Sequence, residues 1–212
     1  MPYIAKNIYQ NVIVAPYYNY SSGELDIYVT SDLWDDVSGT VDMLWLDLEG
    51  NPIADNGGMA SSTKFTVGGL NTTLVLSTNV LSELNLIDAS DAILMLSLTS
   101  TGNLPNSDTR LTFTHSNHFM PSFPNAAKLR DPNLSLSYDS ATKKFTVEAT
   151  GGVSLYTWLT HPAGTMGYFD DNAFVLLPGQ KKEIGFTLTM DKTGGDWMQN
   201  VTVQSIWDQG QP

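Results

Sequence analysis

The 212-residue sequence predicts an all-β protein made of two tandem antiparallel β-sandwiches. Short runs of β-branched and aromatic residues recur between clusters of Gly, Pro, Asn and Ser, and this pattern occurs once in each half of the chain. No alternation of strands with long helices is visible, which argues against a parallel sheet. Because 42% of the residues are hydrophobic and only 15% are charged, the composition excludes a disordered chain or a coiled coil. An immunoglobulin-like topology fits this class, although a chain without Cys lacks the Cys-Trp-Cys core signature.

The first half of the chain predicts a short helix followed by seven strands. Ile4 and Ile8 lie at helical spacing after Pro2, so we expect a helix within residues 2–9. The seven β-favouring runs are residues 12–15, 25–30, 41–48, 63–67, 73–77, 92–99 and 111–114. Residues 79–87 favour one or two helical turns instead. We therefore place the first sandwich at residues 12–114.

The second half begins after a change in composition. Pro121 and Pro124 oppose regular structure, so we place an inter-domain linker at residues 115–127 and the second sandwich at residues 128–212. Its predicted strands are residues 134–138, 144–150, 154–160, 173–177, 183–190 and 201–207. The alternation in residues 183–190 predicts that four side chains face the core: Ile184, Phe186, Leu188 and Met190.

Charge and sequence motifs restrict the partners and the cellular location. The net charge of −12 disfavours a nucleic acid or an anionic membrane as a partner, and no apolar run reaches the roughly 18 to 20 residues of a membrane helix. The first residues lack the basic and apolar regions of a signal peptide. Four N-x-Ser/Thr sequons nevertheless predict a secreted, extracellular protein with N-glycans, so we expect a piece of a longer chain; the sequons are at Asn19, Asn71, Asn133 and Asn200.

No residue pattern predicts a catalytic, metal or cofactor site. His115 and His118 are three residues apart, but no third His or Cys lies near them, and a zinc site needs more ligands. The acidic turns at residues 35–36 and 170–172 lack the spacing of a calcium-binding loop. The five glutamates lie beside turns, in the expected helix or on outward strand positions, so we expect them on the solvated surface rather than as the carboxylate pair of a glycosidase.

Aromatic residues near turns leave a binding role open. We expect Trp45 and Trp158 in the core, because apolar strand residues flank them. The aromatic residues near turns predict a surface that packs against another domain or, as the second choice, stacks on sugar; they are Tyr17, Tyr18, Trp34 and Trp197. The alternative hypothesis is therefore an independent carbohydrate-binding or adhesive protein with two sandwiches.

One stretch of the second half carries a family resemblance. Residues 158–180 read WLTHPAGTMGYFDDNAFVLLPGQ, which resembles the C-terminal sandwich of the β-mannosidases of glycoside hydrolase family 2. The residues that match the family pattern are Gly167, Phe169, Asp171, Asn172, Phe174, Pro178 and Gly179. We expect a structural role for them, with Asp171 and Asn172 capping a turn and Pro178-Gly179 forming a type II turn.

Two further segments agree with this resemblance, and together they imply a function. Residues 1–16 are similar to the end of the family's catalytic barrel, and residues 117–128 are similar to the junction of its last two sandwiches. The resemblance implies that residues 1–11 are a barrel remnant and linker, and that the partners are the barrel and N-terminal domains of the same fungal-like enzyme. Such an enzyme removes terminal non-reducing β-D-mannose residues with retention, using two barrel glutamates. Its acid/base glutamate follows an Asn, and no glutamate in this sequence does, so we expect non-catalytic accessory sandwiches.

Overall fold

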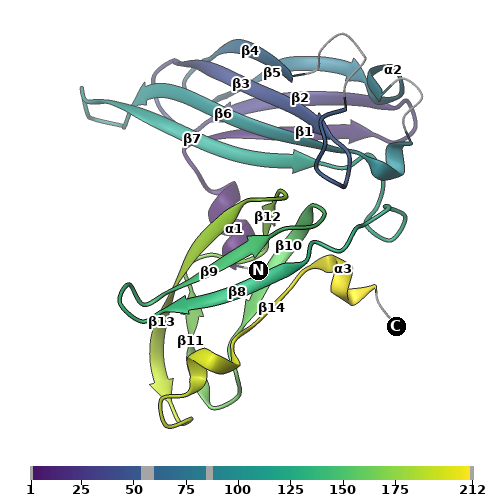
Figure 1. Ribbon diagram of the computed structural model, residues 1–212. Helices are drawn as coiled ribbons and strands as arrows, with labels where there is room; N and C mark the ends of the chain where they lie inside the picture. The colour runs from purple at the N-terminus through teal and green to yellow at the C-terminus, as the bar shows by residue number, and fades with distance from the viewer. Residues whose placement is uncertain (1, 54–59, 85–87, 211–212) are drawn as a thin grey trace. The chain divides into compact units, whose positions relative to one another are not determined.

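The computed structural model describes residues 2–53, 60–84 and 88–210, which form two compact units (Figure 1). The first unit consists of Met1–Asp47 and Asn51–Ala127, and the second consists of Leu48–Gly50 and Lys128–Pro212. Every pair of neighbouring strands is antiparallel. The predicted all-β class with two sandwiches is confirmed.

The first unit packs two sheets around one core. A short helix, α1 (Pro2–Ile8), precedes them. One sheet has the order β1-β2-β5, with β1 at Val12–Asn19, β2 at Glu24–Ser31 and β5 at Asn71–Asn79. The other has the order β4-β3-β6-β7, with β3 at Val37–Leu46, β4 at Ala60–Val67, β6 at Ile93–Asn103 and β7 at Arg110–Phe119. Helix α2 (Val80–Leu84) and the 3-10 turn η1 (Ala89–Asp91) lie between β5 and β6.

Strict alternation explains why these segments form strands. In β2, Leu25, Ile27 and Val29 are at most 1% exposed, while the residues between them point to the outer face of the sheet. The inward residues of the opposite sheet, such as Val41 and Leu98, meet them in the same core. Burial of one face of each sheet supplies the main driving force for this packing.

The second unit repeats this design with shorter strands. One sheet has the order β11-β13-β9-β8, with β8 at Leu134–Asp139, β9 at Lys144–Ala149, β11 at Thr165–Phe169 and β13 at Lys181–Asp191. The other has the order β12-β10-β14, with β10 at Ser154–Thr160, β12 at Phe174–Leu176 and β14 at Thr202–Gln204. The 3-10 turn η2 (Trp197–Asn200) precedes β14, and helix α3 (Ile206–Gln209) follows it. Phe145, with no exposed surface, lies in the centre of the core.

Several element boundaries differ from the prediction. The strand expected at residues 201–207 is only β14 (Thr202–Gln204), because Ser205 caps helix α3, which begins at Ile206. Residues 115–119 belong to β7 rather than to a linker, because they continue its pairing with β6 up to Leu94 and Phe119. Strand β11 was not predicted, because Gly167 interrupts its apolar pattern. The predicted helix at residues 79–87 is α2, and residues 85–87 lie outside the described part of the chain.

Four predictions of which side chains are buried are wrong. Trp158 is 39% exposed, because the alternation of β10 buries its neighbours Thr157 and Leu159 instead. Trp197 is buried at 7% exposure, since η2 turns it into the core. Leu188 is 44% exposed, because it lies in the second half of β13, where no residue is buried. A bulge in the pairing of β11 with β13 moves Met190 to the face that carries Met166, so Met190 is exposed.

Candidate functional site

The family motif places one buried amide between two strands of the second unit. Asn172 is 4% exposed and lies in the segment between β11 and β12. Its Oδ1 accepts a hydrogen bond from the backbone N–H of Leu159 at 2.7 Å, and its Nδ2 donates to the carbonyl oxygen of Leu159 at 3.0 Å. The side chain therefore pairs with β10 as a backbone peptide group does in a sheet. The backbone N–H of Asn172 donates a hydrogen bond to Oδ1 of Asp171 at 2.8 Å.

Aromatic rings surround this segment and anchor it to the core. Phe169, at the end of β11, packs on Phe186 of β13 with ring centroids 4.7 Å apart and on Phe145 at 5.9 Å. Trp197 joins the same cluster, 4.7 Å from Phe186. Such tilted and edge-to-face contacts are favourable beyond the burial of area. Phe169 thus anchors the end of β11 in the core of the second unit.

Charged and turn residues complete the motif on the surface. Lys182 donates to Oδ2 of Asp171 at 2.5 Å, and its ammonium lies 4.4 Å from the ring centroid of Phe174. Gly179 has a φ of +80°, and the N–H of Gln180 donates to the carbonyl oxygen of Leu177 at 3.0 Å. This geometry is a type II turn, in which the position of Gly179 requires a positive φ. These contacts support a structural role for the motif.

The carboxyl groups with shifted pKa values do not have the properties of a glycosidase acid. Hydrogen bonds from the Ala141 N–H and the Thr142 hydroxyl lower the pKa of Asp139, and hydrogen bonds from the hydroxyl and N–H of Thr193 lower that of Asp191. A general acid in glycoside hydrolysis needs the opposite shift. Three glutamates instead form surface ion pairs: Glu49 with Arg130, Glu148 with Lys181 and Glu183 with Lys144. The side chain of Glu83 lies outside the described part of the structure.

The two histidines of β7 have structural contacts rather than a shared ligand geometry. The Nδ1 of His115 accepts from the backbone N–H of Val14 at 3.1 Å, and its Nε2 lies 3.1 Å from the carbonyl oxygen of Asn7. These contacts require a neutral ring with the proton on Nε2, and burial lowers the pKa of His115 accordingly. His118 points to the other face of the sheet, and burial lowers its pKa as well. Within residues 2–53, 60–84 and 88–210, no three His, Asp or Glu residues group in a way that could hold a metal ion.

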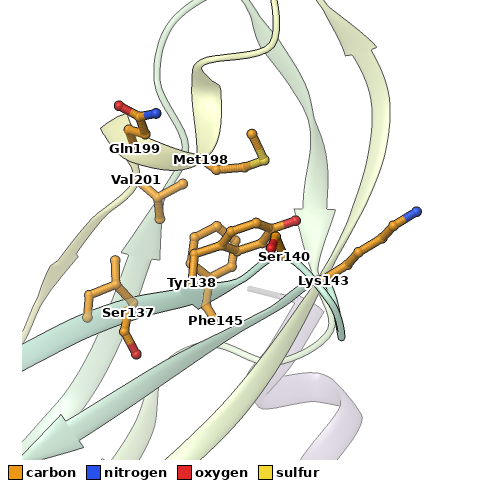
Figure 2. Close-up of a pocket in the computed structure, with 9 residues that line it drawn as sticks. Ser137, Tyr138, Ser140, Lys143, Phe145, Met198, Gln199 and Val201 are labelled. Carbon is orange, nitrogen blue, oxygen red and sulfur yellow. The ribbon is translucent and has the colours of Figure 1, made fainter.

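The second unit has an open cavity of about 580 Å³ between the edge strand β8 and the segment formed by η2 and Val201 (Figure 2). Figure 2 shows the rings of Tyr138 and Phe145 lying over one another, with Met198 and Val201 facing them, while the side chain of Lys143 extends away. The walls are therefore mainly apolar, and no pair of carboxylates converges on the cavity. A second hollow of about 430 Å³, lined by Leu44, Met95 and several Ser side chains, lies on the β3 and β6 strands of the first unit. Neither has the groups that glycoside hydrolysis needs.

All four sequon asparagines are exposed, but their side-chain amides differ. Nδ2 of Asn133 donates to Oγ1 of Thr150 at 2.6 Å, and Nδ2 of Asn200 donates to the carbonyl oxygen of Asp196 at 3.1 Å. Asn19 and Asn71 use only Oδ1, which accepts from nearby backbone N–H groups. In the second pair, the nitrogen that would carry a glycan makes no hydrogen bond within the described chain.

Comparisons with known proteins match both units. The model of a Mannosidase Ig/CBM-like domain matches residues 23–118, and the model of an Ig-fold domain of the mannosidases matches residues 129–209. β-mannosidase A of Aspergillus flavus is 58% identical over 207 residues, and that of Aspergillus niger is 56% identical over the same length. Both units of the chain therefore match domains of β-mannosidases. Each alignment covers 98% of this chain but 22% of the relative, so the chain spans about a fifth of the length of these β-mannosidases.

Solved structures show the same fold in distant proteins. A β-D-mannosidase from Dictyoglomus thermophilum aligns with a TM-score of 0.57 and 14% identity, covering 96% of this chain and 22% of that one. An exo-chitosanase from Amycolatopsis orientalis aligns with a TM-score of 0.53 and 13% identity, covering 96% of this chain and 26% of that one. In this chain the recognisable motif therefore lies in an immunoglobulin-like sandwich, where its residues make packing and hydrogen-bond contacts.

Two features of this arrangement were not predicted from the sequence. Asn172 was expected to cap a turn, and its bridge to β10 was not expected, because no sequence signal shows where a side-chain amide replaces a backbone partner. The hydrogen bonds of His115 to Val14 of β1 and Asn7 of α1 were not expected either. The alternation of β7 would have placed His115 on the inner face, had the strand been extended to Phe119.

Proposed function

We propose that this chain is the pair of non-catalytic, C-terminal sandwiches of a secreted, extracellular β-mannosidase of glycoside hydrolase family 2. The parent enzyme hydrolyses terminal non-reducing β-D-mannose residues with retention, and its catalytic barrel and N-terminal domains are the partners of this chain. The sandwiches stabilise the barrel, carry N-glycans and shape access to its cleft.

The observation that supports this proposal is the high identity to β-mannosidase A along 98% of the chain, which covers 22% of that relative. In the described part of the chain, the motif residues make packing contacts, whereas a catalytic site would need two converging carboxyl groups. The exposed side chains of α1, Ile4 and Ile8, are 47% and 55% exposed and form an apolar surface suited to packing against another domain.

An independent carbohydrate-binding protein is the second candidate, and exposed aromatic rings favour it. Tyr20 and Phe123 are both about 60% exposed, and their rings stack with centroids 5.2 Å apart and an interplanar angle of 10°. Because these rings face one another, they do not lie side by side as a flat platform for a sugar chain. Trp34, at 59% exposure in the turn after β2, is another exposed ring that could stack on sugar, as are the exposed rings of Tyr9, Tyr17 and Tyr168.

Activity measurements on the chain and on a full-length relative test this proposal. We expect the chain, with its mass confirmed as residues 1–212 alone, to release no nitrophenol from an aryl β-D-mannoside, while full-length Aspergillus niger β-mannosidase A does. Turnover that persists in the mass-verified chain would contradict the accessory role. Retention of the chain on a mannan column that is lost in Trp34→Ala would favour the carbohydrate-binding alternative.

A further inference from the structure

The end of β1 brings an exposed tyrosine and a sequon asparagine onto one face. Tyr17 and Asn19 are two residues apart in this strand, so both point to the outer face of the sheet. Tyr18 between them points the other way and packs on Phe119, with ring centroids 5.0 Å apart. The ring of Tyr17 is 62% exposed. The sequon at Asn19 therefore follows, two residues later on the same face, the solvent-exposed ring of Tyr17.

The outer face beside Tyr17 carries two polar residues of β2. Asp26 and Tyr28 alternate with the buried Leu25, Ile27 and Val29, so they point to this face. The Tyr28 hydroxyl donates to Oδ2 of Asp26 at 3.1 Å, and this hydrogen bond raises the pKa of Tyr28. Tyr17 also lies opposite Asp26 in the register of β1 and β2, and Asn19 lies opposite Glu24.

The side chain of Asn19 is oriented by the turn that follows it. Its Oδ1 accepts from the backbone N–H groups of Ser21 at 3.0 Å and Ser22 at 3.4 Å. This Asx-turn directs Oδ1 toward the turn, so Nδ2 on the other side of the amide is available. By contrast, the Nδ2 atoms of Asn133 and Asn200 already donate to neighbouring groups, and a glycan would leave each of them only one N–H.

We propose that Asn19 carries an N-linked glycan and that the first N-acetylglucosamine of this glycan packs on the exposed ring of Tyr17. This inference rests on the secretion of the chain, which is part of the proposed function. In the transfer, C1 of the sugar leaves the diphosphate oxygen of a lipid-linked oligosaccharide and bonds to Nδ2 of Asn19, which loses a proton. The lipid diphosphate is the leaving group, and the secretory pathway of the host supplies the donor.

The chemistry of the site fits a sugar. The C–H groups on one side of a pyranose ring are apolar and pack on a phenol face, while its hydroxyls need hydrogen-bond partners. Glu24 and Asp26 place carboxylate oxygens on β2 beside the two residues, where they can accept from such hydroxyls. Covalent attachment keeps the sugar at a high effective concentration near the ring, so even a weak contact is populated. The packed sugar would stabilise the β1–β2 hairpin.

Asn71 provides a matched control within the same sheet. It is exposed, its Oδ1 accepts from the N–H of Thr72 at 2.8 Å, and its Nδ2 makes no hydrogen bond within the described residues. Two positions before it stands Gly69, which has no ring. A glycan at Asn71 should therefore form without the stabilisation that Tyr17 provides at Asn19.

The test uses the 212-residue chain secreted from a yeast host, with glycan occupancy determined by peptide mass spectrometry and stability by Tm. We expect Asn19 to be occupied, and Ser21→Ala, which removes the sequon but keeps the Asx-turn, to lower Tm by about 2–4 °C. The same change should have no effect in a Tyr17→Ala background, whereas Tyr17→Phe should preserve it. Trimming with an endoglycosidase that leaves one N-acetylglucosamine should retain the Tm, and Asn71→Gln should not change it.

Three results would overturn this inference. The first is an unoccupied Asn19 when Asn71 is glycosylated, which would leave the secreted accessory role intact. The second is a stabilising glycan at Asn19 whose effect persists without the Tyr17 ring. The third is a lack of glycan at all four sequons; the aryl mannoside assay would still test the accessory role independently.

Discussion

Replacing Asn172 with Ala should destabilise the second unit by about 2–6 kcal/mol. The substitution removes two hydrogen bonds, of 2.7 and 3.0 Å, to the N–H and the carbonyl oxygen of Leu159. Leu159 is 1% exposed, so water does not replace the lost partners. Each buried polar group left without a partner costs about 1–3 kcal/mol, and two are created here.

Urea unfolding followed by tryptophan fluorescence measures this loss, because Trp197 lies in the core of the same unit. Asn172→Asp keeps an acceptor for the Leu159 N–H but places a buried carboxylate oxygen against the Leu159 carbonyl oxygen, so it should cost at least as much as Asn172→Ala. Asn200→Ala removes an exposed asparagine of the same unit and should cost less than about 0.5 kcal/mol. If Asn172→Ala cost no more than this control, the amide would not act as a substitute for a backbone partner.

Three other predictions follow from described contacts. Because burial lowers the pKa of His115, the folded first unit binds fewer protons than the unfolded chain, so its Tm should be highest above pH 6.5 and fall as the solution is acidified. His115→Gln should flatten this dependence of Tm on pH. An unchanged pH dependence in the variant would mean that the hydrogen bond between the Val14 N–H and His115 is unimportant. In thermal melts, Gly167→Ala should destabilise the chain more than Gly179→Ala. A Cβ at residue 167 would lie 2.3 Å from the Thr187 carbonyl oxygen, whereas a Cβ at residue 179 meets open space and costs only the strain of a positive φ, about 1–2 kcal/mol. The reverse order of the two Tm values would refute the steric argument. Phe145→Ala should cost about 3–5 kcal/mol in urea unfolding, and a smaller loss would mean that the surrounding rings close the space.

Most of the fold could be predicted because short apolar runs and turn residues are local signals. All seven expected strands of the first unit are present, and the type II turn at Pro178-Gly179 has the φ that its sequence predicts. Strand β11 escaped prediction because it depends on pairing with β13, a contact far away in sequence. The exposed Met190 has the same cause, since the bulge that reverses its direction arises only when the two strands pair.

Side-chain burial was less predictable than strand position. Trp158 was expected in the core and is exposed, whereas Trp197 was expected on the surface and is buried. Apolar neighbours and proximity to a turn do not determine which face of an element meets the core. The motif residues could be identified by resemblance, but the bridge from Asn172 to β10 could not. A hydrogen bond between residues 13 positions apart depends on how β10 and the β11–β12 segment come together.

The short helix after β14 limits how the edge of this sheet can associate. Ser205 and Asp208 form a capping box, in which the Ser205 N–H donates to Oδ2 of Asp208 at 2.6 Å. The cap ends the extended backbone after the three residues of β14, which is the last strand of its sheet. An edge of three residues offers few unpaired backbone groups as a template for a strand of another molecule. The capping box therefore limits the pairing of this sheet edge with a strand of another molecule.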